Sequence, residues 1–363
     1  MIAALVVVAS LLPGLPALAG PPTQAPPPQP PQLFAPTSIW NMPVPARAAR
    51  DSGSARLVAS LIAQKNTYRA WINTTSYSTP VYQVPAHQAT TRVWVDHPPS
   101  ANADTLEEQL ARVPIPTDAQ PSNDSDSRMV VWQPSSDTQW EFWHVSKQTA
   151  SLQPGWHIGW GAVIHNVSQS SGINPWPFGA TASGLALMGG LITLDDVRAN
   201  DIEHALALGV PRVTRGAAVA PANRSDGRFT GSSTIPEGTR FRLDPKLNLD
   251  ALGLPRATLA IARAAQRYGM IVRDGSGSVS LYAEDPTPAG SNPYPEWFGG
   301  QSPSQLLARF PWSHLQVLPP NRGDGTPVRL AKAPKRHAKR HMKRHTKRHH
   351  KRRHHHKRKR HHH

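Results

Sequence analysis

The excess of positive over negative charge in this chain lies at one end, which restricts where a folded core can form. Residues 329–363 hold 17 Lys or Arg and no Asp or Glu, so they account for the whole formal net charge of +17. Subtracting them leaves 23 basic and 23 acidic residues, and the rest of the chain is formally neutral. A polycationic run without an apolar face cannot offset the entropy lost on ordering. We therefore expect the core to lie entirely upstream of this tail, which we predict to be disordered.

The predicted partners of the tail are anionic polymers. Cell-wall polymers, acidic polysaccharides, nucleic acids and anionic membrane surfaces would all bind it in a salt-dependent manner. Neutral imidazole binds Zn²⁺, Ni²⁺ or Cu²⁺, so weak metal sites are also expected in the tail, at His337, His341, His345 and His349. The alternative is a low-complexity extension that has no selected partner.

The N-terminus has the pattern of a secretory signal. An apolar run of about a dozen residues is too short to span a bilayer, and the small-residue sequence Ala17-Leu18-Ala19 follows it. We predict a signal peptide over 1–19 and a Pro-rich spacer over 20–33. The mature protein is then expected to be a secreted or extracellular monomer, associated with the cell wall through its tail. It should have no transmembrane segment and no specific nucleic-acid partner.

The body, residues 34–318, has to fold without covalent cross-links because the chain contains no Cys. A region of this size buries about three quarters of its unfolded surface, which is enough for a stable core. The absence of thiols also excludes Cys nucleophiles and Cys-based zinc sites. A turn-rich linker at 319–328 separates the body from the tail.

Short β-branched and aromatic segments bounded by Pro, Ser, Asp or Asn dominate the body and predict strands. They are residues 69–73, 81–84, 91–96, 129–133, 140–145, 156–167, 239–243, 270–273, 279–283 and 314–318. Asp274-Gly275-Ser276-Gly277 predicts a hairpin turn between two of them. Because no βαβ rhythm is visible, the pattern predicts a mainly β fold, an antiparallel, jelly-roll-like β-sandwich with a few peripheral helices.

Helical spacing and capping residues predict a small number of helices. They cover residues 54–65, 104–113, 255–268 and 303–309. Residues 202–210 are ambiguous, because their apolar positions alternate as in a strand while Ile202, Ala205 and Leu206 also fit a helix. We favour a strand that follows a short helix at 194–199.

Six segments of the body carry a resemblance to other proteins. They are Ser38-Ile39-Trp40-Asn41, residues 75–82, residues 129–143, Gly179-Ala180-Thr181-Ala182-Ser183-Gly184, Arg240-Phe241-Arg242-Leu243-Asp244-Pro245 and Tyr282-Ala283-Glu284-Asp285-Pro286. On these segments the chain resembles a group of uncharacterised secreted proteins of high-GC Gram-positive bacteria, over nearly the whole body but neither the spacer nor the tail. That group has no established activity, so the resemblance implies an extracellular bacterial setting and no particular chemistry.

Tryptophans are the candidate ligand-binding residues, since all 11 lie in the body. Indole rings stack on the C–H faces of sugars and donate a hydrogen bond, so exposed tryptophans on extracellular domains often bind glycans. We take Trp40, Trp140, Trp143 and Trp160 as candidate sugar platforms and Arg224 as a substrate-binding cation. For each tryptophan the alternative is a place in the core.

Glu141 is the leading candidate for acid–base chemistry. On a strand it shares a face with Trp143, so apolar neighbours can raise its pKa. Glycoside hydrolysis needs a second carboxyl group about 5 to 9.5 Å away, for which Asp226 and Asp285 are candidates. The alternative is that Glu141 faces water on an edge strand.

Polysaccharide lysis requires a proton-abstracting base and a cation that neutralises a uronate. His204 and Arg224 are candidates for these roles, although His204 lies between apolar residues and also fits a core position. Motifs for serine hydrolases, P-loops and zinc peptidases are absent, so no cofactor is expected.

The sequence therefore predicts a secreted protein that acts on or binds an extracellular glycan. As an enzyme it would be a glycoside hydrolase or a polysaccharide lyase. The alternative is a non-enzymatic cell-envelope or surface-binding protein.

Overall fold

The computed structural model describes residues 33–96, 103–150 and 152–321. No helix within these ranges is long and apolar enough to cross a membrane. The predicted signal peptide, most of the Pro-rich spacer and the whole tail with its histidines lie outside the described residues.

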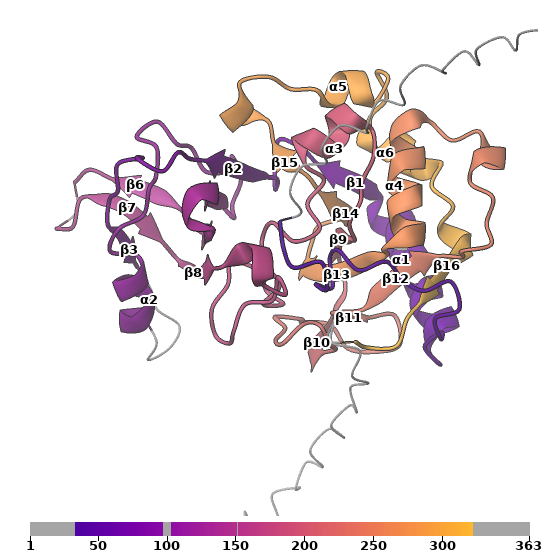
Figure 1. The fold of residues 1–363 in the computed structure, drawn as a ribbon. Helices are drawn as coiled ribbons and strands as arrows, with labels where there is room; N and C mark the ends of the chain where they lie inside the picture. The colour runs from indigo at the N-terminus through magenta and orange to yellow at the C-terminus, as the bar shows by residue number, and fades with distance from the viewer. Residues whose placement is uncertain (1–32, 97–102, 151, 322–363) are drawn as a thin grey trace, which may run out of the picture.

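The larger of two main sheets has six strands in the order β1-β14-β9-β13-β12-β16. These strands are β1 (Ala70–Asn73), β9 (Leu206–Val210), β12 (Arg240–Leu243), β13 (Met270–Gly275), β14 (Val279–Tyr282) and β16 (Leu315–Val317). In Figure 1 this sheet lies beside the helices α1 (Ser54–Tyr68), α4 (Arg256–Arg267) and α6 (Pro303–Ala308).

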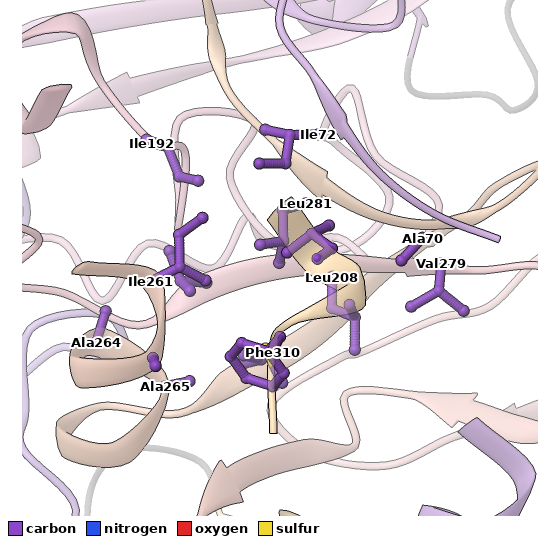
Figure 2. Close-up of a cluster of buried hydrophobic side chains, with 14 of the residues drawn as sticks. Ala70, Ile72, Ile192, Leu208, Ile261, Ala264, Ala265, Val279, Leu281 and Phe310 are labelled. Atoms are coloured by element: carbon purple, nitrogen blue, oxygen red, sulfur yellow. The ribbon is translucent and has the colours of Figure 1, made fainter. Parts of the chain in front are cut away.

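Alternation along the strands divides their side chains between the two faces of this sheet. Leu208 of β9 and Leu281 of β14 lie on the face that packs against the helices, where Ile261 of α4 and Phe310 meet them. Figure 2 shows this apolar cluster. On the opposite face, Ala207 and its neighbours pack towards the second main sheet.

The second main sheet has five strands in the order β15-β2-β4-β5-β8. They are β2 (Thr79–Gln83), β4 (Met129–Gln133), β5 (Thr138–Trp143), β8 (Trp160–His165) and β15 (Glu284–Asp285). Its outer face shares an apolar cluster with helix α2 (Ala103–Gln109) and with a three-stranded sheet. That smaller sheet consists of β3 (Val93–Val95), β6 (Ser146–Gln148) and β7 (Gly155–Ile158), and it lies at the left of Figure 1.

The remaining elements are small. A two-stranded sheet pairs β10 (Val213–Ala218) with β11 (Ile235–Glu237) below the six-stranded sheet in Figure 1. Helices α3 (Leu194–Ala199) and α5 (Tyr294–Trp297) lie above the six-stranded sheet in the same view.

The mainly β prediction is confirmed, but the expected antiparallel pairing is wrong, because the sheets are mixed. Parallel pairs are β1 with β14, β9 with β13, β2 with β4, β2 with β15, β3 with β7 and β10 with β11. Apolar alternation reports which face of a strand is buried but carries no information about its direction. Long connections such as the one from β2 to β4 allow the chain to return and pair in parallel.

The predicted hairpin at 274–277 is also wrong. Strand β9 lies between β13 and β14, parallel to the first and antiparallel to the second. All five residues of β9 are buried, and a strand that is apolar on both faces belongs in the middle of a sheet. It therefore separates the two strands that a local turn would otherwise have paired.

Most predicted elements are present, and the ambiguity at 202–210 is resolved in favour of a strand. Helix α3 occupies 194–199 as predicted, and β9 follows it. The predicted strand at 156–167 is divided at Gly159 into β7 and β8, which belong to different sheets. Strands β6, β10, β11 and β15 and helix α5 were not predicted.

Candidate functional site

Glu141 lies on β5 and is fully buried. Its Oε1 accepts hydrogen bonds from Asn174 Nδ2 (2.8 Å) and the Ala180 amide (2.9 Å). Its Oε2 accepts from the Leu187 amide (2.7 Å) and Gln139 Nε2 (3.1 Å). Burial raises the pKa of Glu141, although these hydrogen bonds act against the shift. The carboxylate therefore anchors the 174–187 loop and faces neither solvent nor a cleft.

An ion pair joins the two sheets next to this network. Arg128 precedes β4, and its Nη2 donates to Asp274 Oδ2 of β13 at 2.8 Å and forms a second ion pair with Asp126 Oδ2 at 2.9 Å. The guanidinium carbon of Arg273 lies 4.3 Å from the ring centroid of Tyr282, and that of Arg128 lies 5.6 Å from it. The Tyr282 ring, which lines a surface cleft, thus contacts two buried cations.

This cleft has a volume of about 620 Å³ and lies at the edge of the six-stranded sheet. Five short segments, together with the strands β1 and β14, contribute to its lining. The lining residues are Trp71, Asn73, Ser76, Tyr77, Asp126, Arg128, Pro211, Val213, residues 226–229, residues 275–278, Ser280 and Tyr282. Its size falls within the range of small-molecule sites, about 300–1,000 Å³.

Three of the large apolar side chains that remain exposed in the described residues line this cleft. They are Trp71, Tyr77 and Phe229, with exposed fractions of 41%, 44% and 38%. Trp71 points away from the core because Ala70 and Ile72 of the same strand point into it. Aromatic rings that stay in water around one concavity are a cost to solubility and mark a binding surface.

Polar and charged groups occupy the rest of the lining. The Ser280 hydroxyl lies 2.9 Å from that of Ser276 and 2.8 Å from that of Ser278. Arg128 and Asp126 lie on one side of the cleft, and exposed Asp226 comes from a different segment of the chain. Such a mixture of aromatic rings, hydroxyls and carboxylates suits a ligand that has apolar faces and many hydroxyl groups.

A buried carboxyl group lies close to Asp226. Glu237 is fully buried on β11, and neither of its carboxyl oxygens has a hydrogen bond of normal length and angle. Burial raises its pKa to about 8, and the charges of Asp274 and Asp226 add to the rise. The Ser225 hydroxyl and the Asp226 amide oppose the shift by a smaller amount. Glu237 is therefore mainly protonated at neutral pH, but it does not line the cleft.

The tryptophans that the sequence suggested as sugar platforms do not line this cleft. Trp40, Trp140 and Trp160 are buried, with exposed fractions of 1%, 7% and 7%. Trp143 is half-buried, and its Nε1 donates to Asp126 at 3.5 Å while its ring stacks on His144. The three buried rings therefore belong to the core, which was the alternative to sugar binding for each of them.

Arg224 is occupied by the backbone of the chain itself. Its Nη1 donates to the carbonyls of Pro177 (2.9 Å) and Phe178 (2.6 Å), and its Nη2 to those of Gly179 (3.1 Å) and Thr181 (2.7 Å). The Ala180 amide in the same segment donates to Glu141. Arg224 and Glu141 thus hold one loop from two sides.

The other proposed catalytic groups lie apart. His204 donates from Nδ1 to the Ala205 carbonyl (2.9 Å), and its Nε2 is 3.0 Å from Asp196 Oδ2. Burial lowers its pKa, but the Asp196 carboxylate and the two hydrogen bonds outweigh it, so the pKa is raised overall. Asp285 accepts from Ser78 Oγ (2.7 Å) and from the Thr287 amide (2.9 Å) and lines a different cavity. Of the catalytic candidates, only Asp226 lines the 620 Å³ cleft.

The sequence analysis did not identify Asp126 or the exposed aromatic residues of the cleft, Trp71, Tyr77 and Phe229. The sequence does contain a signal that could have identified Trp71. In the predicted strand 69–73, Trp71 occupies the face opposite to Ala70 and Ile72, so it could have been assigned to the surface. Tyr77 and Phe229 lie on loops, whose positions depend on the sheet order.

Comparison of the chain with protein-family models, with curated proteins and with solved structures finds no match in any of the three. Within the described residues, no group of three or more His, Asp or Glu side chains could hold a metal ion. The case for a function therefore rests on the geometry of the cleft.

Proposed function

We propose that this protein is secreted and binds an extracellular glycan in the 620 Å³ cleft. The observation that carries the proposal is the convergence of three exposed aromatic side chains, Trp71, Tyr77 and Phe229, on one cleft with a polar lining. Their rings offer apolar surfaces for sugar C–H faces, and the serine hydroxyls, Asp126 and Asp226 offer hydrogen bonds to sugar hydroxyls.

The proposal extends to the layers that support the cleft. We propose that the two main sheets are the layers of the predicted β-sandwich. Support comes from the apolar cluster that Ala207 and Ile271 of one sheet share with Ile164 of the other. The Arg128–Asp274 ion pair, which links the residue directly before β4 to β13, also supports it.

A second candidate function is hydrolysis of the bound glycan. It is favoured by Asp226, an exposed carboxyl group in the cleft that lies close to the largely protonated Glu237. A carboxylate and a carboxylic acid near one site are the groups that glycoside hydrolysis requires. Because Glu237 is buried and does not line the cleft, binding has the stronger support. The non-enzymatic surface-binding alternative shares this site.

The test of binding is a glycan array probed with the protein and with Trp71→Ala. Loss of a stacking ring should weaken binding about 10-fold, which corresponds to about 1.4 kcal/mol. Leu252→Ala, which removes an exposed side chain outside the cleft (exposed fraction 37%), serves as the matched control. Binding that is unaffected by Trp71→Ala would rule out this cleft as the glycan site. A reducing-end assay with Asp226→Asn on any bound glycan tests hydrolysis.

The tail contributes a separate proposal, based on the sequence. We propose that residues 329–363 hold the secreted protein to anionic material of the cell envelope, in keeping with its resemblance to secreted bacterial proteins. Deleting them should abolish retention on isolated cell walls at low salt, whereas the full chain should be released by raising the salt concentration. Equal retention of both forms would contradict this role.

A further inference from the structure

A second cavity lies next to the aromatic cleft. Its volume is about 680 Å³, and its lining is almost entirely polar. The lining residues are Thr75, residues 120–124, Ser127, Asp285 and Thr287. Exposed side chains such as Thr75, Gln120, Asn123 and Thr287 make its surface accessible.

The two cavities share two walls. In the first wall, Thr75 lines the polar cavity and the following residues, Ser76 and Tyr77, line the aromatic cleft. In the second wall, Asp124 and Ser127 line the polar cavity, whereas Asp126 and Arg128 line the cleft. Two short segments of chain therefore separate the cavities, and each contributes side chains to both.

The ridge between the cavities is a fixed turn at Tyr77. This residue has a positive φ of 52°, and its amide donates to Asp124 Oδ2. Its hydroxyl lies 3.2 Å from that of Ser125. Asp124 Oδ1 accepts from the amides of Asp126 (2.9 Å) and Ser127 (3.2 Å). One carboxylate thus fastens both walls, and the Tyr77 ring is held in place before any ligand binds.

The charges along the two cavities disfavour an anionic ligand. Among the described residues no Lys or Arg lines the polar cavity, which contains Asp124 and Asp285. In the cleft, Asp126 and Asp226 offset Arg128 and Arg228, and Arg128 is already paired with carboxylates. A uronate unit in the polar cavity would meet like charge without a counter-ion, whereas a neutral sugar would find amides, hydroxyls and carboxylates as hydrogen-bond partners.

We propose that the aromatic cleft and the polar cavity are adjoining subsites of one groove, which binds an extended, uncharged glycan chain across the Tyr77 turn. This inference rests on the proposed glycan-binding function and adds two properties to it: recognition of several consecutive sugar units, and selection against uronate polymers. The aromatic cleft supplies stacking, and the polar cavity supplies hydrogen bonds to the next units of the chain. Uronate selection by a polysaccharide lyase is not compatible with this groove.

The test is an array of linear neutral oligosaccharides of two to eight units in (1→3), (1→4) and (1→6) linkages, together with length-matched oligouronates. We expect affinity for one neutral series to rise at least 10-fold from the shortest to the longest member, and the matched uronates to bind more weakly.

A variant that fills the polar cavity tests whether the gain in affinity with oligosaccharide length comes from this cavity. Asn123→Trp should remove the gain with length while leaving affinity for the shortest ligand unchanged. Asn248→Trp, at an exposed asparagine that lines neither cavity, should behave like the unmodified protein.

Three results would overturn the groove: neutral ligands whose affinity does not depend on length, tighter binding of uronates, or a length gain that survives in Asn123→Trp. In each of these cases glycan binding in the aromatic cleft would still stand. If no oligosaccharide binds, the proposed function and the groove both fail.

Discussion

Glu237 makes the stability of this protein depend on pH, and the substitution Glu237→Gln removes this contribution alone. The folded structure raises the pKa of this buried carboxyl group from an ordinary value of 4.5 to about 8. Between these two values the folded state holds a proton that the unfolded state releases. Stability contributed by this group is therefore fully present below pH 4.5 and is lost as the pH rises towards about 8.

The magnitude follows from the difference between the two pKa values. Since a change of one in a pKa corresponds to about 1.36 kcal/mol, the rise from 4.5 to about 8 corresponds to about 5 kcal/mol. About 4 kcal/mol of this should be lost between about pH 5 and about pH 9. Glu237→Gln keeps the shape of the protonated side chain and removes the titration, so its stability should lack this part of the pH dependence.

Urea unfolding of the protein and of Glu237→Gln, measured from about pH 5 to about pH 9, gives both free energies of unfolding. Relative to the unmodified protein, the variant should gain about 4 kcal/mol across this range. The unpaired amide that this substitution introduces adds a cost of about 1–3 kcal/mol that does not vary with pH. Glu108→Gln, at an exposed carboxyl on α2, is the matched control. Parallel curves for the unmodified protein and Glu237→Gln would refute the reasoning.

Three other substitutions test the structural roles assigned above. Glu141→Ala leaves the Ala180 and Leu187 amides without an acceptor and should lower the free energy of unfolding by about 3–5 kcal/mol; a loss below about 1 kcal/mol in urea unfolding would contradict the anchoring role. Gly189→Ala places a Cβ 2.4 Å from Cε2 of the buried Trp40 ring and should cost about 1–3 kcal/mol, visible as a lower melting temperature, whereas Gly277→Ala, where the Cβ meets open space, should not. His204→Asn should destabilise more at about pH 5.5 than at about pH 8.5, because the raised pKa of His204 gives stability that is lost as pH rises through it; an equal loss at both pH values would exclude the His204–Asp196 ion pair as its source.

The positions of most strands and helices could be predicted from the sequence, whereas their pairing could not. A short apolar and β-branched run identified the strand that becomes β13, and apolar residues at helical spacing identified the helix that becomes α4. Neither the parallel direction of β2 and β4 nor the insertion of β9 follows from a local pattern. These depend on contacts between segments that are far apart in the sequence.

Local sequence patterns also failed to show which single residues come together at the candidate site. Glu141 has the sequence context of an acid in a cleft, but β5 lies inside its sheet, and the loop that covers it comes from residues 174–187. Asp226 and Asp285 were both proposed as a second carboxyl group on a turn, and only Asp226 lies in the cleft. Trp71 and Tyr77 become neighbours of Asp226 only after the sheet order is known.

The insertion of β9 between β13 and β14 also determines how this sheet can be assembled. The chain from 270 to 282 cannot close on itself as it emerges, since the two strands bind a third that was synthesised well before them. A fragment that starts after Val210 would lack β1 as well as β9, so β13 would keep only β12 as a neighbour and β14 would have no neighbouring strand. Because both strands would expose unpaired backbone groups, such a fragment is expected to aggregate, or to bind a separate peptide of the sequence 205–210 along β13.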